Sequence, residues 1–251
     1  MKTKMLAIVF LAAPLLAAPA RIINANLQSV PSLAQAPSTG WIGYAVTLNR
    51  TFTTCGCHLG SSSENMSDVS REPSAGVLFA RFDDGHVARV RLFSTCEIDA
   101  DHQTVTWVEN VSPSESIAFL RRAIEDGTNS GRESALFALA MHEGGIDPLI
   151  EIARHDASGH LRGQALFWLS QAAGEKAAAA LRDAVDNDPE ESVRAKAVFG
   201  ISQLPNDQSI PMLIDLLEHN RSREVRKKAA FWLGQKNDPR ALDAIAAILQ
   251  Q

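Results

Sequence analysis

The sequence lacks the short motifs by which many enzymes are recognised. It has no G-x-S-x-G nucleophile elbow, no H-E-x-x-H zinc pair and no glycine-rich phosphate loop. Its seven histidines share no common spacing. These absences exclude the enzyme classes that depend on those motifs. We expect a non-catalytic protein without a cofactor.

Runs of basic residues are also missing. The chain has 24 Lys and Arg against 29 Asp and Glu, a formal net charge of −5. Nucleic acids and anionic membranes are bound by clustered positive charge. We therefore expect neither of these partners.

No apolar run approaches the ~20 residues that span a bilayer. One shorter apolar stretch, residues 5–16, follows Lys2 and Lys4 and precedes Ala18-Pro19-Ala20. This order is typical of a secretory signal peptide over residues 1–20, cleaved near Ala20. We expect a periplasmic or secreted protein that is not inserted in a membrane once the signal is removed.

Cysteine is scarce: the chain has Cys55, Cys57 and Cys96. The run C-G-C-H lacks the two spacer residues of a haem c attachment motif. One alternative is a disulfide from Cys96 to Cys55 or Cys57, closing a loop of about 40 residues and stabilising the fold by about 3–4 kcal/mol. The other is a zinc site of the three cysteines and His58. Exported cysteines are usually oxidised, which favours the disulfide and leaves one thiol over.

The sequence pattern changes twice after the predicted signal peptide. Residues 21–40 contain prolines and no periodicity, which predicts a linker. Residues 41–110 contain alternating segments such as W-I-G-Y-A-V-T-L, and Asp84-Gly85 is a hairpin signal between two of them. Ser112, Pro113 and Glu115 then form a capping box that predicts the start of a helix. We expect a small β-rich domain over 41–110 and only helices over 112–251.

The helical region is repetitive. Copies of one helix begin at Arg132, Arg162, Arg194 and Arg226, about 30 residues apart, with Ala, Phe and Leu or Ile at fixed offsets after each arginine. A second helix lies between successive copies. Such a period predicts an α-solenoid of about four helix pairs, so that the chain is mostly α.

The pattern D-x5-R-x-x-A-x-F-x-L, preceded by I-P-x-L-I-x-L-L, resembles the HEAT repeats of the phycobilisome-lyase-like type. With the leader and the cysteine-bearing β segment, the chain resembles exported bacterial HEAT-repeat proteins of unassigned activity. The resemblance covers residues 112–251 well and 41–110 loosely. It implies a HEAT-like solenoid and, as function, only the binding of a partner, because many activities share this scaffold.

A polar residue precedes three of the repeat arginines by six positions. We expect it to accept N–H groups at a helix start and to be bridged by an arginine, within or across repeats, as in the ladder of HEAT repeats. An uncharged asparagine should make a weaker rung than an aspartate. The pairs of this structural ladder are Asp156 with Arg162, Asp188 with Arg194, and Asn220 with Arg226.

At about 100° per residue, the repeat Phe falls about 140° from the arginine, almost opposite the apolar stripe. The phenylalanines form either a buried spine between repeats or an exposed apolar strip that binds a peptide. Gly200 of the third repeat stands where the repeats on either side have Trp168 and Trp232, which predicts a notch there. The candidate partner-binding residues are Phe137, Phe167, Phe199, Phe231, Gln171, Gln203, Gln235, Lys196, Lys228, Trp168 and Trp232.

The function that we expect is non-catalytic binding of another protein, or of an extended peptide, in the concave groove of the solenoid. The alternative is an N-terminal domain that binds a metal or small molecule, with the solenoid as its platform. A lyase-like chaperone of a pigment is a remoter version that follows from the resemblance alone. The sequence carries no signal of oligomeric state.

Overall fold

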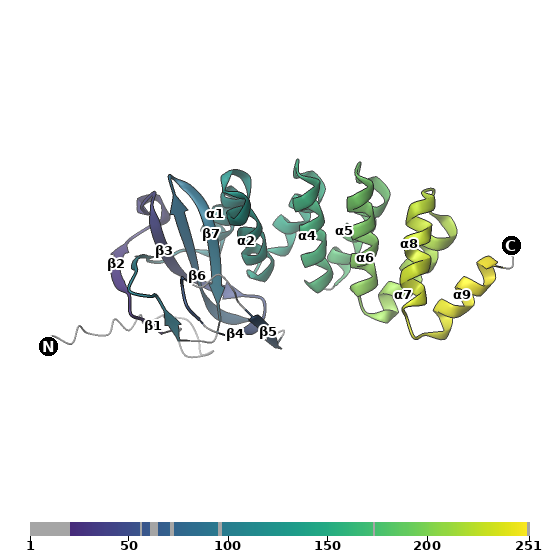
Figure 1. The fold of residues 1–251 in the computed structure, drawn as a ribbon, viewed down its shortest axis with the longest axis horizontal. Helices are drawn as coiled ribbons and strands as arrows, with labels where there is room; N and C mark the ends of the chain where they lie inside the picture. The colour runs from purple at the N-terminus through teal and green to yellow at the C-terminus, as the bar shows by residue number, and fades with distance from the viewer. Residues whose placement is uncertain are drawn as a thin grey trace. The chain divides into compact units, whose positions relative to one another are not determined.

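The computed structural model describes residues 21–249, except 56, 61–64, 71–72, 95–96 and 173. The predicted signal peptide and Cys96 lie outside these residues. The chain divides after Gly145 into an N-terminal unit and a C-terminal unit (Figure 1). None of the helices in the described part is long and apolar enough to cross a bilayer.

The N-terminal unit combines strands with two helices. Its elements are β1 (Ile22–Ile23), β2 (Asn26–Val30), a 3-10 turn (Leu33–Gln35), β3 (Gly40–Leu48), β4 (Thr51–Cys55), β5 (Asn65–Ser70), β6 (Ser74–Asp83), β7 (His86–Phe93), β8 (Ile98–Asp99), β9 (Thr104–Val108), α1 (Pro113–Asp126) and α2 (Asn129–Met141).

A five-stranded sheet with the order β2-β9-β3-β6-β7 is the centre of this unit. β6 is antiparallel to both β3 and β7, whereas β9 runs parallel to β2 and β3. Asp84 and Gly85 connect β6 to β7 with φ values of 49° and 83°. Positive φ at both positions is what a two-residue hairpin turn requires, so the predicted hairpin is confirmed.

The linker predicted over residues 21–40 is wrong, because this segment adds strands to the unit. β2 pairs in parallel with β9 from Asn26 to Val30, and β1 pairs with β8. β2 thereby covers an edge of β9 that would otherwise present unpaired N–H and C=O groups. Its side chains are exposed or half-buried on both faces, so it lacks the apolar alternation that marks a strand in a sequence.

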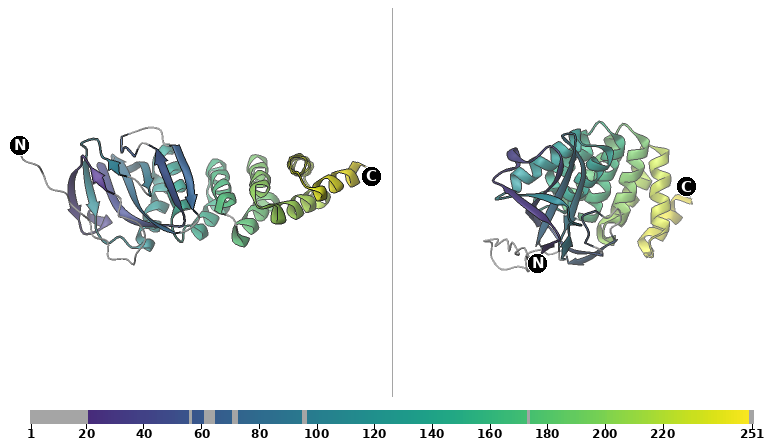
Figure 2. Two further views of the ribbon diagram at one scale, coloured as in Figure 1. Left: turned by 90° about the horizontal axis from the view of Figure 1, so that it is seen from below. Right: turned by 60° about the vertical axis from the view of Figure 1, so that its left-hand side comes forward.

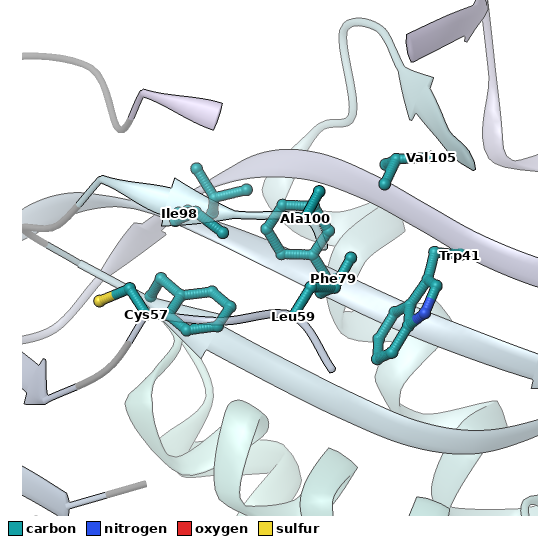
Figure 3. Close-up of a cluster of buried hydrophobic side chains, with 9 residues drawn as sticks. Trp41, Cys57, Leu59, Phe79, Ile98, Ala100 and Val105 are labelled. Atoms are coloured by element: carbon teal, nitrogen blue, oxygen red, sulfur yellow. The ribbon is translucent and has the colours of Figure 1, made fainter. Parts of the chain in front are cut away.

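The core of the unit gathers residues from segments that are far apart in the chain (Figure 3). Phe79 and Phe93 meet edge to face at 5.8 Å between ring centroids. Leu59, from the segment between β4 and β5, and Ile98, from β8, belong to the same buried cluster. The buried members are Trp41, Cys57, Leu59, Val77, Phe79, Phe93, Ile98, Ala100 and Val105.

Helix α1 begins with the predicted capping box. The Glu115 N–H donates to Ser112 Oγ at 3.3 Å, and the Ser112 N–H donates to Glu115 Oε2 at 2.9 Å. Pro113 occupies the first turn, where its missing N–H costs nothing. The change from strands to helices therefore lies where the sequence indicates it.

The first copy of the repeat, α2, belongs to the N-terminal unit and not to the repeat array. The Val90 N–H of edge strand β7 donates to Ser134 Oγ of α2 at 2.8 Å. A Cβ at Gly131 would lie 1.8 Å from the Val87 carbonyl oxygen, so only glycine permits this approach. The compact units thus divide after Gly145, whereas the expected domain boundary lay near residue 112.

The C-terminal unit consists of helices in successive pairs (Figures 1 and 2). This confirms a mostly α fold in which a helical repeat region follows a small strand-rich part in the chain. Within it, α4 packs on α6 and α6 on α8. The helices are α3 (Ile146–His155), α4 (Gly159–Ala172), α5 (Glu175–Asn187), α6 (Glu191–Gln203), α7 (Asn206–His219), α8 (Arg223–Gly234) and α9 (Pro239–Leu249).

The notch predicted at Gly200 is absent from this described part of α6. A Cβ at this position would lie 2.5 Å from Leu181 Cδ2 of α5 and 3.5 Å from Ser170 Cβ. Leu181 is fully buried and fills the space that a tryptophan would need. The glycine therefore allows a close contact between helices instead of leaving a hollow.

One rung of the predicted ladder is a buried ion pair. Arg162 donates from Nε to Asp188 Oδ2 at 2.8 Å and from Nη2 to Asp188 Oδ1 at 3.0 Å. The two side chains are 6% and 4% exposed. Nη2 also contacts Glu190 Oε1 at 3.0 Å, and Nη1 donates to the Asp156 carbonyl at 2.9 Å. The rung therefore joins the turn before α4 to the turn before α6.

The other two arginines donate to carbonyl groups of the turns before their own helices. Arg194 Nη1 donates to the Asp188 carbonyl, and Arg226 Nη1 donates to the Asn220 carbonyl, each at 2.7 Å. The Asn220 amide donates to Asp186 instead. Neither arginine makes a bidentate pair with the polar residue six positions before it among the described residues, whether that residue is Asp188 or Asn220.

We predict that Asp188→Asn lowers the free energy of unfolding by about 3 kcal/mol, because it leaves the buried Arg162 guanidinium without its main partner. Arg154→Gln is the matched control. It removes an ion pair with Asp183 that also joins neighbouring repeats, but whose side chains are 42% and 38% exposed, so the loss should stay below about 1 kcal/mol. Urea unfolding followed by circular dichroism measures both, and equal losses would contradict the assignment.

The same pair predicts a pH dependence. Burial alone would raise the pKa of the Asp188 carboxyl, but hydrogen bonds from Arg162 and from the Glu190 N–H outweigh it and lower this pKa. A carboxyl with a lowered pKa stabilises the fold above its unfolded pKa of about 3.9, and the stabilisation is lost as pH falls through the folded value. The stability difference between wild type and Asp188→Asn should therefore be largest near neutral pH and shrink below about pH 4. Urea midpoints across this range test it, and a constant difference would disprove it.

Candidate functional site

The repeat phenylalanines of the C-terminal unit lie outside its packed interior. Phe167 on α4 is 37% exposed and Phe231 on α8 is 55% exposed, while Phe199 on α6 is half-buried. On the same helices the alanine and the leucine or isoleucine of each repeat are fully buried. The structure thus places the rings on the outward side, where the angular argument puts them. A wholly buried spine is ruled out for these three residues.

Tryptophan rings contact each of the three repeat phenylalanines. Phe167 meets Trp168 at 5.0 Å between centroids, and Phe231 meets Trp232 at 4.9 Å. Trp232 also contacts Phe199 at 5.1 Å, which links α6 to α8. We call Phe167, Trp168, Phe199, Phe231 and Trp232 the aromatic strip. The remaining candidate ring, Phe137, is half-buried on α2 and belongs to the N-terminal unit.

Two of the three candidate glutamines are held by a chain of hydrogen bonds. Ser170 Oγ donates to the Phe167 carbonyl at 2.6 Å, and Gln171 Nε2 donates to Ser170 Oγ at 3.3 Å. The next repeat has the same chain through Ser202 and Gln203, at 2.6 and 3.1 Å. The serine therefore fixes the amide that follows it. Its recurrence eight positions after the arginine was the signal in the sequence that we missed.

The last repeat departs from this arrangement. Gly234 stands where α4 and α6 have serine, and Gln235 is exposed. Among the described residues, no hydrogen bond of the Gln235 side chain is found. Lys236 instead reaches the preceding repeat, donating from Nζ to the Ser202 carbonyl at 2.7 Å and to Asn206 Oδ1 at 3.1 Å.

The candidate lysines lie beside the strip. Lys196 and Lys228 are exposed, and each precedes a repeat phenylalanine by three residues, which places the two side chains on one helix face. A Cβ at Gly163 would lie 2.4 Å from Lys196 Cδ and 2.8 Å from its Nζ. Lys196 therefore extends from α6 across α4, over a position where the chain has no side chain.

The cysteines are placed only in part. Cys57 is 8% exposed in the core cluster, where Figure 3 shows its sulfur at the edge of the buried group. The side chain of Cys55 and all of Cys96 lie outside the described residues. His58 is exposed while its neighbours Cys57 and Leu59 are buried, so adjacent side chains point to opposite sides. This segment does not bring Cys57 and His58 together, which disfavours the zinc set that includes both.

His58 instead meets two aspartates. Its Nδ1 lies 3.4 Å from Asp101 Oδ1 and 3.9 Å from Asp99 Oδ2, a group of the ligand types that hold divalent cations. Hydrogen bonds from the Asp101 N–H and from Asn24 lower the pKa of the Asp99 carboxyl. Both carboxylates therefore have partners already, since Asp101 Oδ2 accepts the Gly60 N–H at 3.0 Å. The buried Arg91 guanidinium, which interacts with Asp101, adds a positive charge that competes with a cation.

Comparisons with known proteins bear on the C-terminal unit. Residues 146–230 match the family model of HEAT repeats, and residues 225–251 match that of the PBS lyase HEAT-like repeat. No curated protein matches the chain. A solved structure of human deoxyhypusine hydroxylase in complex with glycerol is 20% identical, with a TM-score of 0.35, over 54% of this chain and 57% of that one. This likeness spans little more than half of that enzyme and carries no argument. The family matches agree with the helix pairs observed over residues 146–249, so the C-terminal unit contains HEAT-like repeats.

Proposed function

We propose that the protein is a non-catalytic scaffold that binds an extended segment of another protein along the aromatic strip. The observation that carries this proposal is the exposure of Phe167 and Phe231 on helices whose repeat alanines and leucines are fully buried. Large exposed apolar side chains that gather in a row are typical of interaction surfaces.

The polar residues beside the strip suit a polypeptide partner. A glutamine amide offers one acceptor and two donors, so it can meet both the C=O and the N–H groups of an extended backbone. Gln171 and Gln203 are already oriented by their serines, which reduces the entropy lost when a partner binds. The buried pair of Arg162 and Asp188 connects the repeats that present these groups.

We place this activity in the periplasm or outside the cell. The leader-like order of residues 1–20 supports export. The bonded state of the Cys57 sulfur supports it as well, because disulfides persist in oxidising compartments. In this proposal the partner of Cys57 is Cys55 or Cys96.

A second candidate function is the binding of a divalent cation by the N-terminal unit. The group of His58, Asp99 and Asp101 favours it, since its three ligand atoms lie within 4.8 Å of one another. The existing hydrogen bonds of both carboxylates oppose it. It therefore ranks below partner binding.

The strip can be tested with a random peptide library displayed on phage. We expect clones selected on the wild-type protein to bind the double variant Phe167→Ser, Phe231→Ser at least tenfold more weakly, because each lost ring removes about 1 kcal/mol or more of binding. Circular dichroism should be unchanged, since both rings are exposed.

Leu242→Ser is the matched control, because it removes an exposed apolar side chain, 59% exposed, on α9 and outside the strip. Selected clones should bind this variant as they bind wild type. Equal binding to all three proteins, or loss of helical content in the double variant, would refute the strip as the binding surface.

Thiol and metal analysis separates the two candidate functions. For protein purified from the exported fraction and unfolded without reductant, we expect one reactive thiol per chain and substoichiometric zinc, since one disulfide uses two of the three cysteines. Thiol titration measures the number of reactive thiols per chain, and elemental analysis measures the zinc content. Three thiols together with one zinc per chain would favour the metal-binding alternative.

A further inference from the structure

Charge is distributed unevenly between the two helix layers of the C-terminal unit. Helix α8 has four basic residues against one acidic residue, and α6 has two against one. Helix α7, in the other layer, has three acidic residues and neither lysine nor arginine. In a chain whose formal net charge is −5, the helices that present the aromatic strip are thus locally basic.

The two lysines beside the strip make no direct contact with a carboxylate in the described part of the chain, although the charge of Lys228 interacts with that of Glu224. Neither Lys196 nor Lys228 has a hydrogen bond or ion pair among the described residues. The one carboxylate on this face of α8, Glu224, is engaged by Lys227 at 2.8 Å. Two exposed ammonium groups therefore stand next to exposed phenylalanines, and a neutral or basic partner would leave them unused.

The spacing of the repeats limits the shape of the occupant. Packed helices lie about 8–10 Å apart, so successive phenylalanines present themselves at about that interval along α4, α6 and α8. A polyproline II chain rises about 3.1 Å per residue and returns to the same side every third residue, after about 9 Å. An apolar side chain at every third position of such a segment would meet one repeat after another.

We propose, building on the proposed function, that the occupant of the strip is an extended acidic segment with an apolar residue at about every third position. Its apolar side chains lie against Phe167, Phe199 and Phe231, and its carboxylates meet Lys196 and Lys228. The glutamine amides pair with its backbone.

Four synthetic peptides of equal length test this proposal by fluorescence anisotropy. The first carries Leu at every third position with Asp between. The second has the same composition in scrambled order. The third and fourth replace every Asp with Gln or with Lys. We expect the first to bind best, about tenfold better than the scrambled and glutamine versions, with the lysine version weakest. Binding of the first should also weaken with added salt.

Charge-removing variants identify the groups responsible. Lys196→Gln with Lys228→Gln should weaken the acidic peptide about tenfold and leave the glutamine version unchanged. Lys176→Gln is the control, because it removes an exposed lysine from α5, in the other layer, where it pairs with Asp147. This control should bind the acidic peptide as wild type does.

The outcomes separate this inference from the proposed function. Equal binding of the acidic, glutamine and lysine peptides, all lost in Phe167→Ser, Phe231→Ser, would overturn the acidic partner and leave peptide binding intact. Equal binding of the ordered and scrambled acidic peptides would overturn the spacing. If none of the four binds while phage-selected peptides do, the inference fails alone. If neither binds, the proposed function fails with it.

Discussion

Each helix pair of the repeat domain has an apolar stripe that it cannot bury by itself. It must pack against the next pair, and so buried alanines recur in register at Ala165, Ala197 and Ala229. Once this stripe is used for packing, the opposite side of the same helix faces solvent. The aromatic strip depends on that division, because its phenylalanines occupy the side that packing leaves open.

The buried ion pair fixes the orientation of neighbouring helix pairs relative to each other. Apolar contacts alone tolerate small rotations between neighbouring pairs, whereas the bidentate contact of Arg162 with Asp188 has one geometry. Burying two charges costs desolvation, so such a pair contributes more to orientation than to net stability. The rings on α4 and α6 are thereby held in a fixed relation, which is what a binding surface for an extended chain needs.

The sequence predicted the features that local helix and turn geometry determines, and missed those that depend on a partner distant in the chain. The period of the arginines gave the helix pairs, and the angle of the phenylalanines gave their exposure, because both follow from helix geometry. β2 went unnoticed, since a strand exposed on both faces carries no apolar alternation. The attachment of α2 to β7 rests on Gly131 and Ser134, which look ordinary in the repeat and gain meaning only from the strand beside them.

Position 234 is glycine, whereas α4 and α6 have serine at the corresponding position, so the glutamines at the two ends of the strip have different surroundings. Gln171 and Gln203 are each held by a serine hydroxyl, whereas the exposed Gln235 has no serine before it. Under the proposed function, a bound chain is therefore oriented more strictly over α4 and α6 than over α8. The ligands of such a surface should vary most in the part that reaches Gln235.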